Sequence, residues 1–137
     1  TIINLEDNLL LFFTGFSRSS SKILNEQNKK TIKKDKEMIS NLDYIKSIGY
    51  EIKKNLLKGD CDKFGELMHK HWNYKMKRSK NMSNKSINQI YDYALKNGAS
   101  GGKLIGAGGG GFLLFYSNTP NQLRNALQKK KIRRSKF

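Results

Sequence analysis

Residues 106–111 are five glycines and one alanine between two short apolar runs, and they are the strongest chemical feature of the sequence. Consecutive glycines cost backbone entropy, so they are kept where the chain needs left-handed dihedrals or where a bound group lies against bare main chain. Either need fits a loop facing phosphate, because main-chain N–H groups can then approach an anion unobstructed. We expect a substrate site at Gly106, Ala107, Gly108, Gly109, Gly110 and Gly111. A purely structural glycine turn is the alternative.

Two familiar phosphate motifs do not fit this segment. Residues 106–111 match G-x-G-x-x-G formally, but that fingerprint must open a helix, whereas here an apolar strand pattern follows. The Walker A pattern also fails, because Leu104 follows Gly102-Lys103 where Ser or Thr is required. The segment is therefore predicted to join two strands, at residues 103–105 and 112–116.

A second segment with hydrogen-bond donors lies near the start of the chain. Residues 17–21 read Ser-Arg-Ser-Ser-Ser and precede the apolar residues Ile23 and Leu24 of a predicted helix. The first amides of a helix lack intrahelical partners and favour negative charge, so Ser17 and Arg18 are candidates for binding an anion. Plain N-capping of the helix is the alternative.

Apolar periodicity predicts the elements that must position these candidates. Residues 9–13 form a short apolar run closed by Thr14-Gly15, as in a buried strand, and residues 1–8 look like its approach. A helical core stripe ending near Gly59 follows from steps of three, four and seven between Met38, Leu42, Ile45, Ile52 and Leu56. The predicted fold class is α+β, a small antiparallel sheet of residues 9–13, 103–105 and 112–116 covered by helices.

The next helix should pair with this one as an antiparallel hairpin. Gly59-Asp60 supplies a stop and a new cap, and one face then carries Phe64, Leu67, Met68, His71, Trp72 and Lys75. His69 and His71 are two residues apart and point in different directions on a helix, which argues against a shared metal. His71 is instead predicted to be packed or hydrogen-bonded.

The C-terminal third contains two more predicted helices. One carries apolar residues between positions 87 and 95 and ends at Asn97-Gly98. The other begins at Pro120, with Thr119 as its cap. Residues 132–137 are basic, and the sequence leaves them open as an edge strand or a frayed end.

Charge and cysteine content limit the classes of function. Lysine and arginine number 27 against 11 acidic residues, a net charge of +16, which raises the prospect of a nucleic-acid partner. The excess is nearly all lysine, spread along helices, which is more typical of solvated faces; a small basic nucleic-acid-binding module remains the alternative. Cys61 has no internal disulfide partner, and no apolar run could span a bilayer. We expect a cytoplasmic protein without membrane contact.

Three separated blocks resemble the GHMP (galactose, homoserine, mevalonate, phosphomevalonate) small-molecule kinases. Residues 98–112, GASGGKLIGAGGGGF, resemble the third, C-terminal motif of that superfamily. Residues 11–20, LFFTGFSRSS, and 71–75, HWNYK, are similar to the branch that phosphorylates D-glycero-D-manno-heptose 7-phosphate. The blocks occur in the same order and at similar separations as in that branch, so the resemblance covers nearly the whole chain.

The resemblance implies a two-domain kinase with its active site between the domains. ATP and Mg would be bound mainly by an N-terminal domain whose motifs do not occur in residues 1–137, which correspond to the C-terminal domain. This chain is then expected to hold no catalytic or metal-binding residue and to be inactive alone. Its partners would be the sugar phosphate and the N-terminal domain. Arg18 would contact the 7-phosphate, and Lys75 is a second candidate for an anion contact, unless it is merely solvated.

Overall fold

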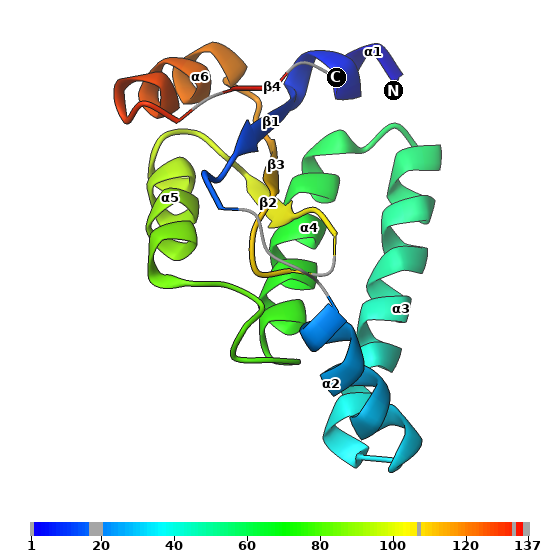
Figure 1. Cartoon of the computed structure of the whole chain (residues 1–137). Helices are drawn as coiled ribbons and strands as arrows, with labels where there is room; N and C mark the ends of the chain where they lie inside the picture. The colour runs from blue at the N-terminus through cyan, green and yellow to red at the C-terminus, as the bar shows by residue number, and fades with distance from the viewer. Residues whose placement is uncertain (1, 17–20, 107, 133, 136–137) are drawn as a thin grey trace.

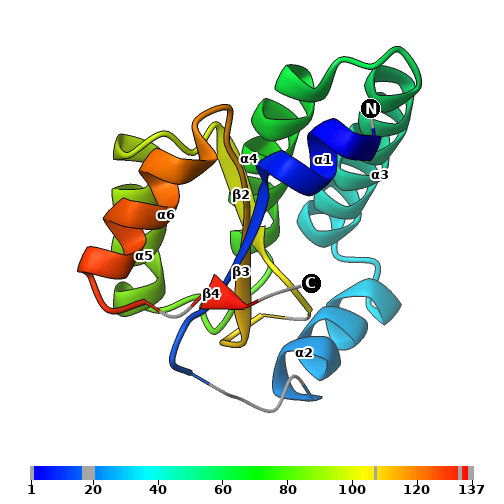
Figure 2. The same cartoon turned by 90° about the horizontal axis from the view of Figure 1, so that it is seen from above.

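An antiparallel sheet lies between two layers of helices (Figures 1 and 2). The computed structural model describes residues 2–16, 21–106, 108–132 and 134–135. The strands, in the order β2-β3-β1-β4, are β1 (Leu9–Phe13), β2 (Gly101–Leu104), β3 (Phe112–Tyr116) and β4 (Arg134–Ser135). The helices are α1 (Ile2–Asn8), α2 (Ser21–Ile32), α3 (Lys36–Leu57), α4 (Cys61–Met76), α5 (Lys85–Lys96) and α6 (Pro120–Lys129). The predicted α+β class, a small antiparallel sheet covered by helices, is confirmed.

Alternation along β1 and β3 divides the apolar side chains between the two layers. Leu10 and Phe12 lie opposite Phe115 and Leu113, and all four are fully buried in the core shared with α5 and α6. Tyr116 points to the other face, where it packs in a smaller cluster with residues of α4. A five-residue strand can therefore serve both layers, because successive side chains leave opposite faces of the sheet.

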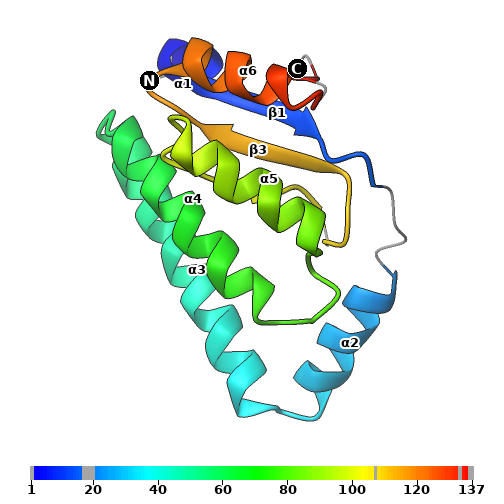
Figure 3. The same cartoon turned by 90° about the vertical axis from the view of Figure 1, so that its left-hand side faces the viewer.

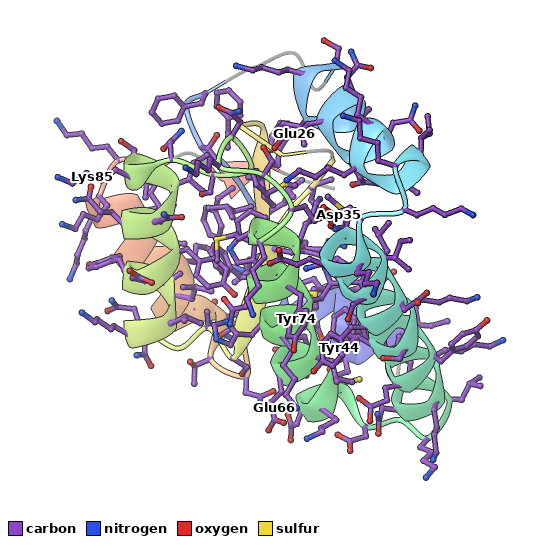
Figure 4. The ribbon with its side chains drawn as sticks, turned by 90° about the horizontal axis from the view of Figure 1, so that it is seen from below. Glu26, Asp35, Tyr44, Glu66, Tyr74 and Lys85 are labelled. Carbon is purple, nitrogen blue, oxygen red and sulfur yellow. The ribbon has the colours of Figure 1, made fainter. Side chains whose placement is uncertain are left out.

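The helices α3 and α4 form the predicted antiparallel hairpin (Figure 3). Its turn is built as expected, because Gly59 has a φ of 78° and the Asp60 carboxylate accepts a 3.0 Å hydrogen bond from the Lys63 amide. Figure 4 shows Tyr44 of α3 beside Tyr74 of α4, and their rings stack with centroids 3.8 Å apart. The hairpin places one face of α4 against β2.

The core stripe predicted for α3 is only partly buried. Met38 is buried as expected, but the other four predicted positions are half-buried, and Ile48, outside the predicted set, is buried instead. The helix lies on the outside of α4, which is its main contact, and it makes a smaller contact with α2. Its apolar stripe therefore packs mainly against α4 and does not point into the centre of the molecule.

The strand before the glycine loop begins two residues earlier than predicted. Gly101 and Gly102 belong to β2, and a Cβ atom on Gly101 would lie only 1.9 Å from the carbonyl oxygen of Gly65 in α4. The two glycines therefore allow the helix and the strand to approach closely. From the sequence alone, the same glycines look like part of a loop.

Three smaller expectations also differ from the structure. Residues 2–8 are the helix α1 and not the approach to a strand; its end is tied to the sheet by the Ser117 amide, which donates to the Asn8 carbonyl at 3.0 Å. Thr119 precedes α6 without a side-chain capping bond, although Pro120 begins the helix as predicted. Within residues 132–137, left open as an edge strand or a frayed end, Arg134–Ser135 form the short edge strand β4, which pairs with β1. None of the helices in the described ranges could cross a bilayer by length and apolarity.

Candidate functional site

The loop between β2 and β3 is fastened to the rest of the molecule through its main chain. The Gly109 amide donates to the Met82 carbonyl and the Gly111 amide to the Phe16 carbonyl, each at 2.7 Å. The Gly111 carbonyl accepts from both the amide and the hydroxyl of Thr14 at 2.9 Å. These bonds fix the loop against the turn after β1 and the segment before α5.

The glycines of this loop have two different environments. A Cβ on Gly108 would lie 2.2 Å from the Met82 sulfur, and one on Gly110 would lie 2.8 Å from the Phe16 carbonyl, so both are needed for close packing. Gly106 is exposed, has a φ of 92° and would place a Cβ in open space. The structural role considered for the glycines thus applies to Gly108 and Gly110, while bare main chain faces outward at Gly106.

Lys75 connects helix α4 to this exposed end of the loop. Its side chain is only 7% exposed, and its ammonium group donates a hydrogen bond to the Gly106 carbonyl. Burial, with smaller contributions from Lys103 and Arg78, lowers the pKa of Lys75 to about 8. A lysine is seldom buried without a partner; here a neutral carbonyl is the partner, so the positive charge is not cancelled.

Repulsion from Lys103 and Arg78 reaches Lys75, and we call these three side chains, Lys75, Arg78 and Lys103, the cationic cluster, with the neutral His71 beside it. Burial lowers the pKa of Lys103, and repulsion from Arg78 adds to this effect. Within the described ranges the ion pairs are Lys30–Glu26 and Lys63–Glu66, and neither includes a member of the cluster. The cluster therefore offers uncompensated positive charge beside Gly106, which favours a bound anion.

The cluster borders a pocket of about 280 Å³ between the α3–α4 hairpin and the sheet, lined by Ile52, Phe64, Met68, His71, Lys103, Ile105 and Leu114. Burial lowers the pKa of His71 to about 4, and repulsion from the Lys103 charge adds to this effect. The ring is therefore neutral near pH 7. Its Nδ1 atom is buried without a hydrogen-bond partner among the described residues. The prediction that His71 is packed is correct, whereas a hydrogen bond to Nδ1 is not found there.

A hydrogen-bonded chain holds β2 in place next to Lys103. The Tyr91 hydroxyl donates to the Gly102 carbonyl at 3.1 Å, and His69 Nδ1 lies 2.8 Å from the same hydroxyl. Since that hydroxyl has one proton, His69 Nδ1 is the donor, and His69 Nε2 accepts from the Asn73 amide at 3.1 Å. His69 is thus a structural residue on the other side of α4 from His71.

Only some of the site residues predicted from the sequence lie together in the structure. Lys75 and the exposed glycine of the loop lie together, and Gly108 to Gly111 form the fastened part of the same loop. Ser17, Arg18 and Ala107 lie outside the described residues. Sequence reasoning missed Lys103, Arg78 and the site role of His71. Arg78 follows Lys75 by one helical turn, which was the available signal, whereas Lys103 reaches the site only through the packing of β2 on α4.

The chemistry of the cluster fits phosphate rather than a metal ion. Lysine and arginine side chains donate to phosphate oxygens and do not ligate magnesium. Within the described ranges, no group of three or more histidine, cysteine or acidic side chains is placed to hold a metal. The arrangement can therefore hold and orient an anionic group next to an open stretch of main chain.

Comparison with known proteins identifies the family of the chain. Residues 52–133 match the family model described as GHMP kinases C terminal. The D-glycero-alpha-D-manno-heptose 7-phosphate kinase of Campylobacter jejuni is 33% identical over 112 residues, which are 82% of this chain and 32% of that protein. The chain thus spans about a third of the length of this relative.

Solved structures share the fold. L. major mevalonate kinase in complex with R-mevalonate has a TM-score of 0.81 and 24% identity, covering 92% of this chain and 40% of that chain. A D-glycero-D-manno-heptose 1-phosphate kinase from Bacteriodes thetaiotaomicron has a TM-score of 0.62 and 22% identity, covering 98% of this chain and 33% of that chain. The family model covers more than half of the sequence, and the chain belongs to the GHMP kinases C terminal family.

Proposed function

We propose that this chain is the acceptor-binding domain of an ATP-dependent sugar-phosphate kinase. The observation that carries the proposal is the buried Lys75, whose ammonium group is held against the exposed Gly106 carbonyl beside Arg78 and Lys103. Phosphoryl transfer depends mainly on positioning the reactants and on stabilising negative charge. A preformed cationic surface next to bare main chain suits an acceptor that already bears a phosphate.

The acceptor that we propose is D-glycero-D-manno-heptose 7-phosphate, phosphorylated at its anomeric hydroxyl to give a 1,7-bisphosphate. Support comes from the Campylobacter relative, a D-glycero-alpha-D-manno-heptose 7-phosphate kinase, and from residues 11–20 and 71–75, which resemble that branch. The 7-phosphate would be bound by Lys75 and by Arg18, with Ser17 as a further donor. The pocket beside His71 would receive part of the sugar, because C–H faces of a sugar pack well on apolar walls.

The nucleotide would be bound elsewhere. We propose that ATP and Mg are held mainly by an N-terminal domain, since the chain spans only 32% of the Campylobacter relative. MgATP supplies the phosphoryl group and an electrophilic metal ion. The part of this chain would be to hold the acceptor phosphate, to orient the sugar and to exclude water with the glycine loop. The 137 residues alone should then show no turnover, and we propose a cytoplasmic location.

The proposal can be tested by removing the charge of Lys75 while keeping its length. In the protein that contains this chain and its N-terminal domain, Lys75→Met should lower kcat/KM for the heptose 7-phosphate by about 10-fold to 100-fold, as expected for one charge-assisted contact. The KM for ATP should stay nearly constant. Lys70→Met is the matched control, because Lys70 is on the same helix and exposed. Equal activity of the two variants would remove the main support for the proposal.

A further inference from the structure

Arg78 is held by two neutral side chains from two different helices. Its Nε atom donates to the Asn41 side-chain carbonyl in α3 at 3.2 Å, and Nη1 donates to the Gln27 side-chain carbonyl in α2 at 3.1 Å. Asn41 is itself fixed, since its amide group donates to the Tyr74 carbonyl at 2.7 Å. The guanidinium group, just beyond the end of α4, is thus oriented by three helices at once.

The nature of these acceptors matters for the charge. A carboxylate in either position would form an ion pair and cancel much of the positive charge, whereas an amide carbonyl orients the group and leaves the charge available. Two of the five guanidinium N–H groups are used in these bonds, which leaves donors for a further acceptor. Arg78 is half-buried, so its charge is less screened by water than that of a surface arginine.

The charge of Arg78 influences the ionisable groups of the candidate site. Repulsion from Arg78 contributes to lowering the pKa of His71, Lys75 and Lys103 alike. Figures 1 and 3 show the loop between β2 and β3 extending toward α2, the helix that holds Arg78 through Gln27. Arg78 is therefore a member of the cationic cluster that is hydrogen-bonded to α2.

Two of the carboxylates near Arg78, those of Glu26 and Asp35, have other hydrogen-bond partners. Glu26 of α2, labelled in Figure 4, accepts a 2.6 Å hydrogen bond from the Ser79 hydroxyl. Asp35 and Arg78 line the same cavity, but the Asp35 carboxylate accepts a 2.8 Å hydrogen bond from the Met38 amide as the cap of α3. Glu37 lines the same cavity, and none of the three forms an ion pair with Arg78 within the described ranges. The arrangement keeps acids near Arg78 without pairing them to it.

We infer that Arg78 binds the phosphate that the acceptor already carries, and that Gln27 and Asn41 are positioning residues that orient its guanidinium group without neutralising it. The inference rests on the proposed function, because it requires a phosphorylated acceptor at this site. A planar fork with free donors can bind two oxygens of a phosphate monoester at once, next to the point charge of Lys75. Arginine at this position thus selects a phosphorylated sugar over the neutral sugar.

The test places a carboxylate where the amide of Gln27 now lies. Gln27→Glu keeps a hydrogen-bond acceptor for Nη1 but pairs the guanidinium group with a negative charge. Asn28→Asp is the matched control, because it adds the same charge to an exposed position next in sequence on the same helix. The affinity of the 137-residue chain for mannose 6-phosphate, with mannose as the neutral comparison, would be measured by amide chemical-shift titration of each variant.

The expected result is an affinity for mannose 6-phosphate lower by about 10-fold in Gln27→Glu and lower by less than about twofold in Asn28→Asp, as expected for losing one charge-assisted contact. The unfolding midpoint of Gln27→Glu should equal or exceed that of the unaltered chain, which excludes misfolding as the cause. Arg78→Lys should also weaken binding, since it keeps the charge but loses the fork.

Two outcomes overturn the inference, and they can be told apart. If the unaltered chain binds mannose 6-phosphate and the Gln27→Glu and Asn28→Asp variants bind it equally well, Arg78 has only a structural role, and the proposed function still stands. If the unaltered chain binds mannose 6-phosphate no better than mannose, the proposed function loses its site, and this inference fails with it.

Discussion

The ammonium group of Lys75 donates a hydrogen bond to the main-chain carbonyl of Gly106, although the two residues are 31 positions apart. The bond joins helix α4 to the exposed end of the loop between β2 and β3. Because the acceptor is neutral, the lysine fixes the loop and still presents a positive charge. Folding and anion binding therefore depend on the same contact.

The close approach of α4 to the sheet predicts opposite effects of one substitution at two helical glycines. In Gly65→Ala the new Cβ would lie 2.8 Å from the Cβ of Ser100 and 3.0 Å from the Tyr116 ring, so the free energy of unfolding should fall by about 1–3 kcal/mol. In Gly49→Ala the Cβ meets nothing within 4 Å, so the gain in helix propensity should add about 1 kcal/mol. Denaturant unfolding of both variants measures the difference; a stabilised Gly65→Ala would contradict the close packing.

The two environments in the glycine loop predict unequal losses of stability. Gly106 and Gly108 both have positive φ, 92° and 119°, so alanine is strained at either position by about 1–3 kcal/mol. Only at Gly108 does the new methyl group also collide with Met82. Gly108→Ala should therefore unfold at a distinctly lower temperature than Gly106→Ala. Equal melting temperatures would show that the loop is not packed as described.

The half-buried imidazole of His71 predicts a pH dependence of stability. Its pKa is lowered from 6.5 to about 4, chiefly by burial, so between these values the unfolded chain binds more protons at this site than the folded chain. The free energy of unfolding should therefore rise as the pH increases from 4 to 6.5 and fall as the pH is lowered through that window. His71→Gln should flatten this part of the profile, measured by denaturant unfolding. A profile unaffected by the substitution would place the imidazole in water.

The net charge of +16 predicts weak and indiscriminate retention of nucleic acid. Lysines on solvated helix faces bind phosphates without reading bases, so two unrelated duplexes should bind equally and be released as salt increases. Fluorescence anisotropy at several salt concentrations measures both properties. A clear preference between the duplexes that persists at physiological salt would favour the nucleic-acid-binding alternative instead.

Much of the fold could be predicted because its patterns are local. The apolar runs of β1 and β3, the Asp60 cap and the hairpin of α3 and α4 all follow from spacing along the chain. The helix α1 could not be predicted in this way: apart from Leu5, its apolar side chains are exposed, so no periodic burial marks it as a helix. The start of β2 was missed because Gly101 serves a contact with Gly65 of α4 that spacing does not reveal.

The site was predictable to a smaller extent. Lys75 was found because it lies one turn after His71, and the loop was found from its glycines. Lys103 and Arg78 were missed because their places depend on how β2 packs on α4 and on how Gln27 and Asn41 hold the guanidinium group. A cationic cluster of this kind arises from tertiary packing, so charge counts along the sequence cannot separate it from the solvated lysines.

The most direct test of the account is to locate where D-glycero-D-manno-heptose 7-phosphate contacts the 137-residue chain, by amide chemical-shift mapping with the unphosphorylated heptose as comparison. The account predicts perturbations confined to Gly106, its loop and the residues around Lys75, Arg78 and Lys103, and their loss in Lys75→Met but not in Lys70→Met. Perturbations spread over the exposed lysines of α2 and α3, or the same response to both sugars, would contradict it.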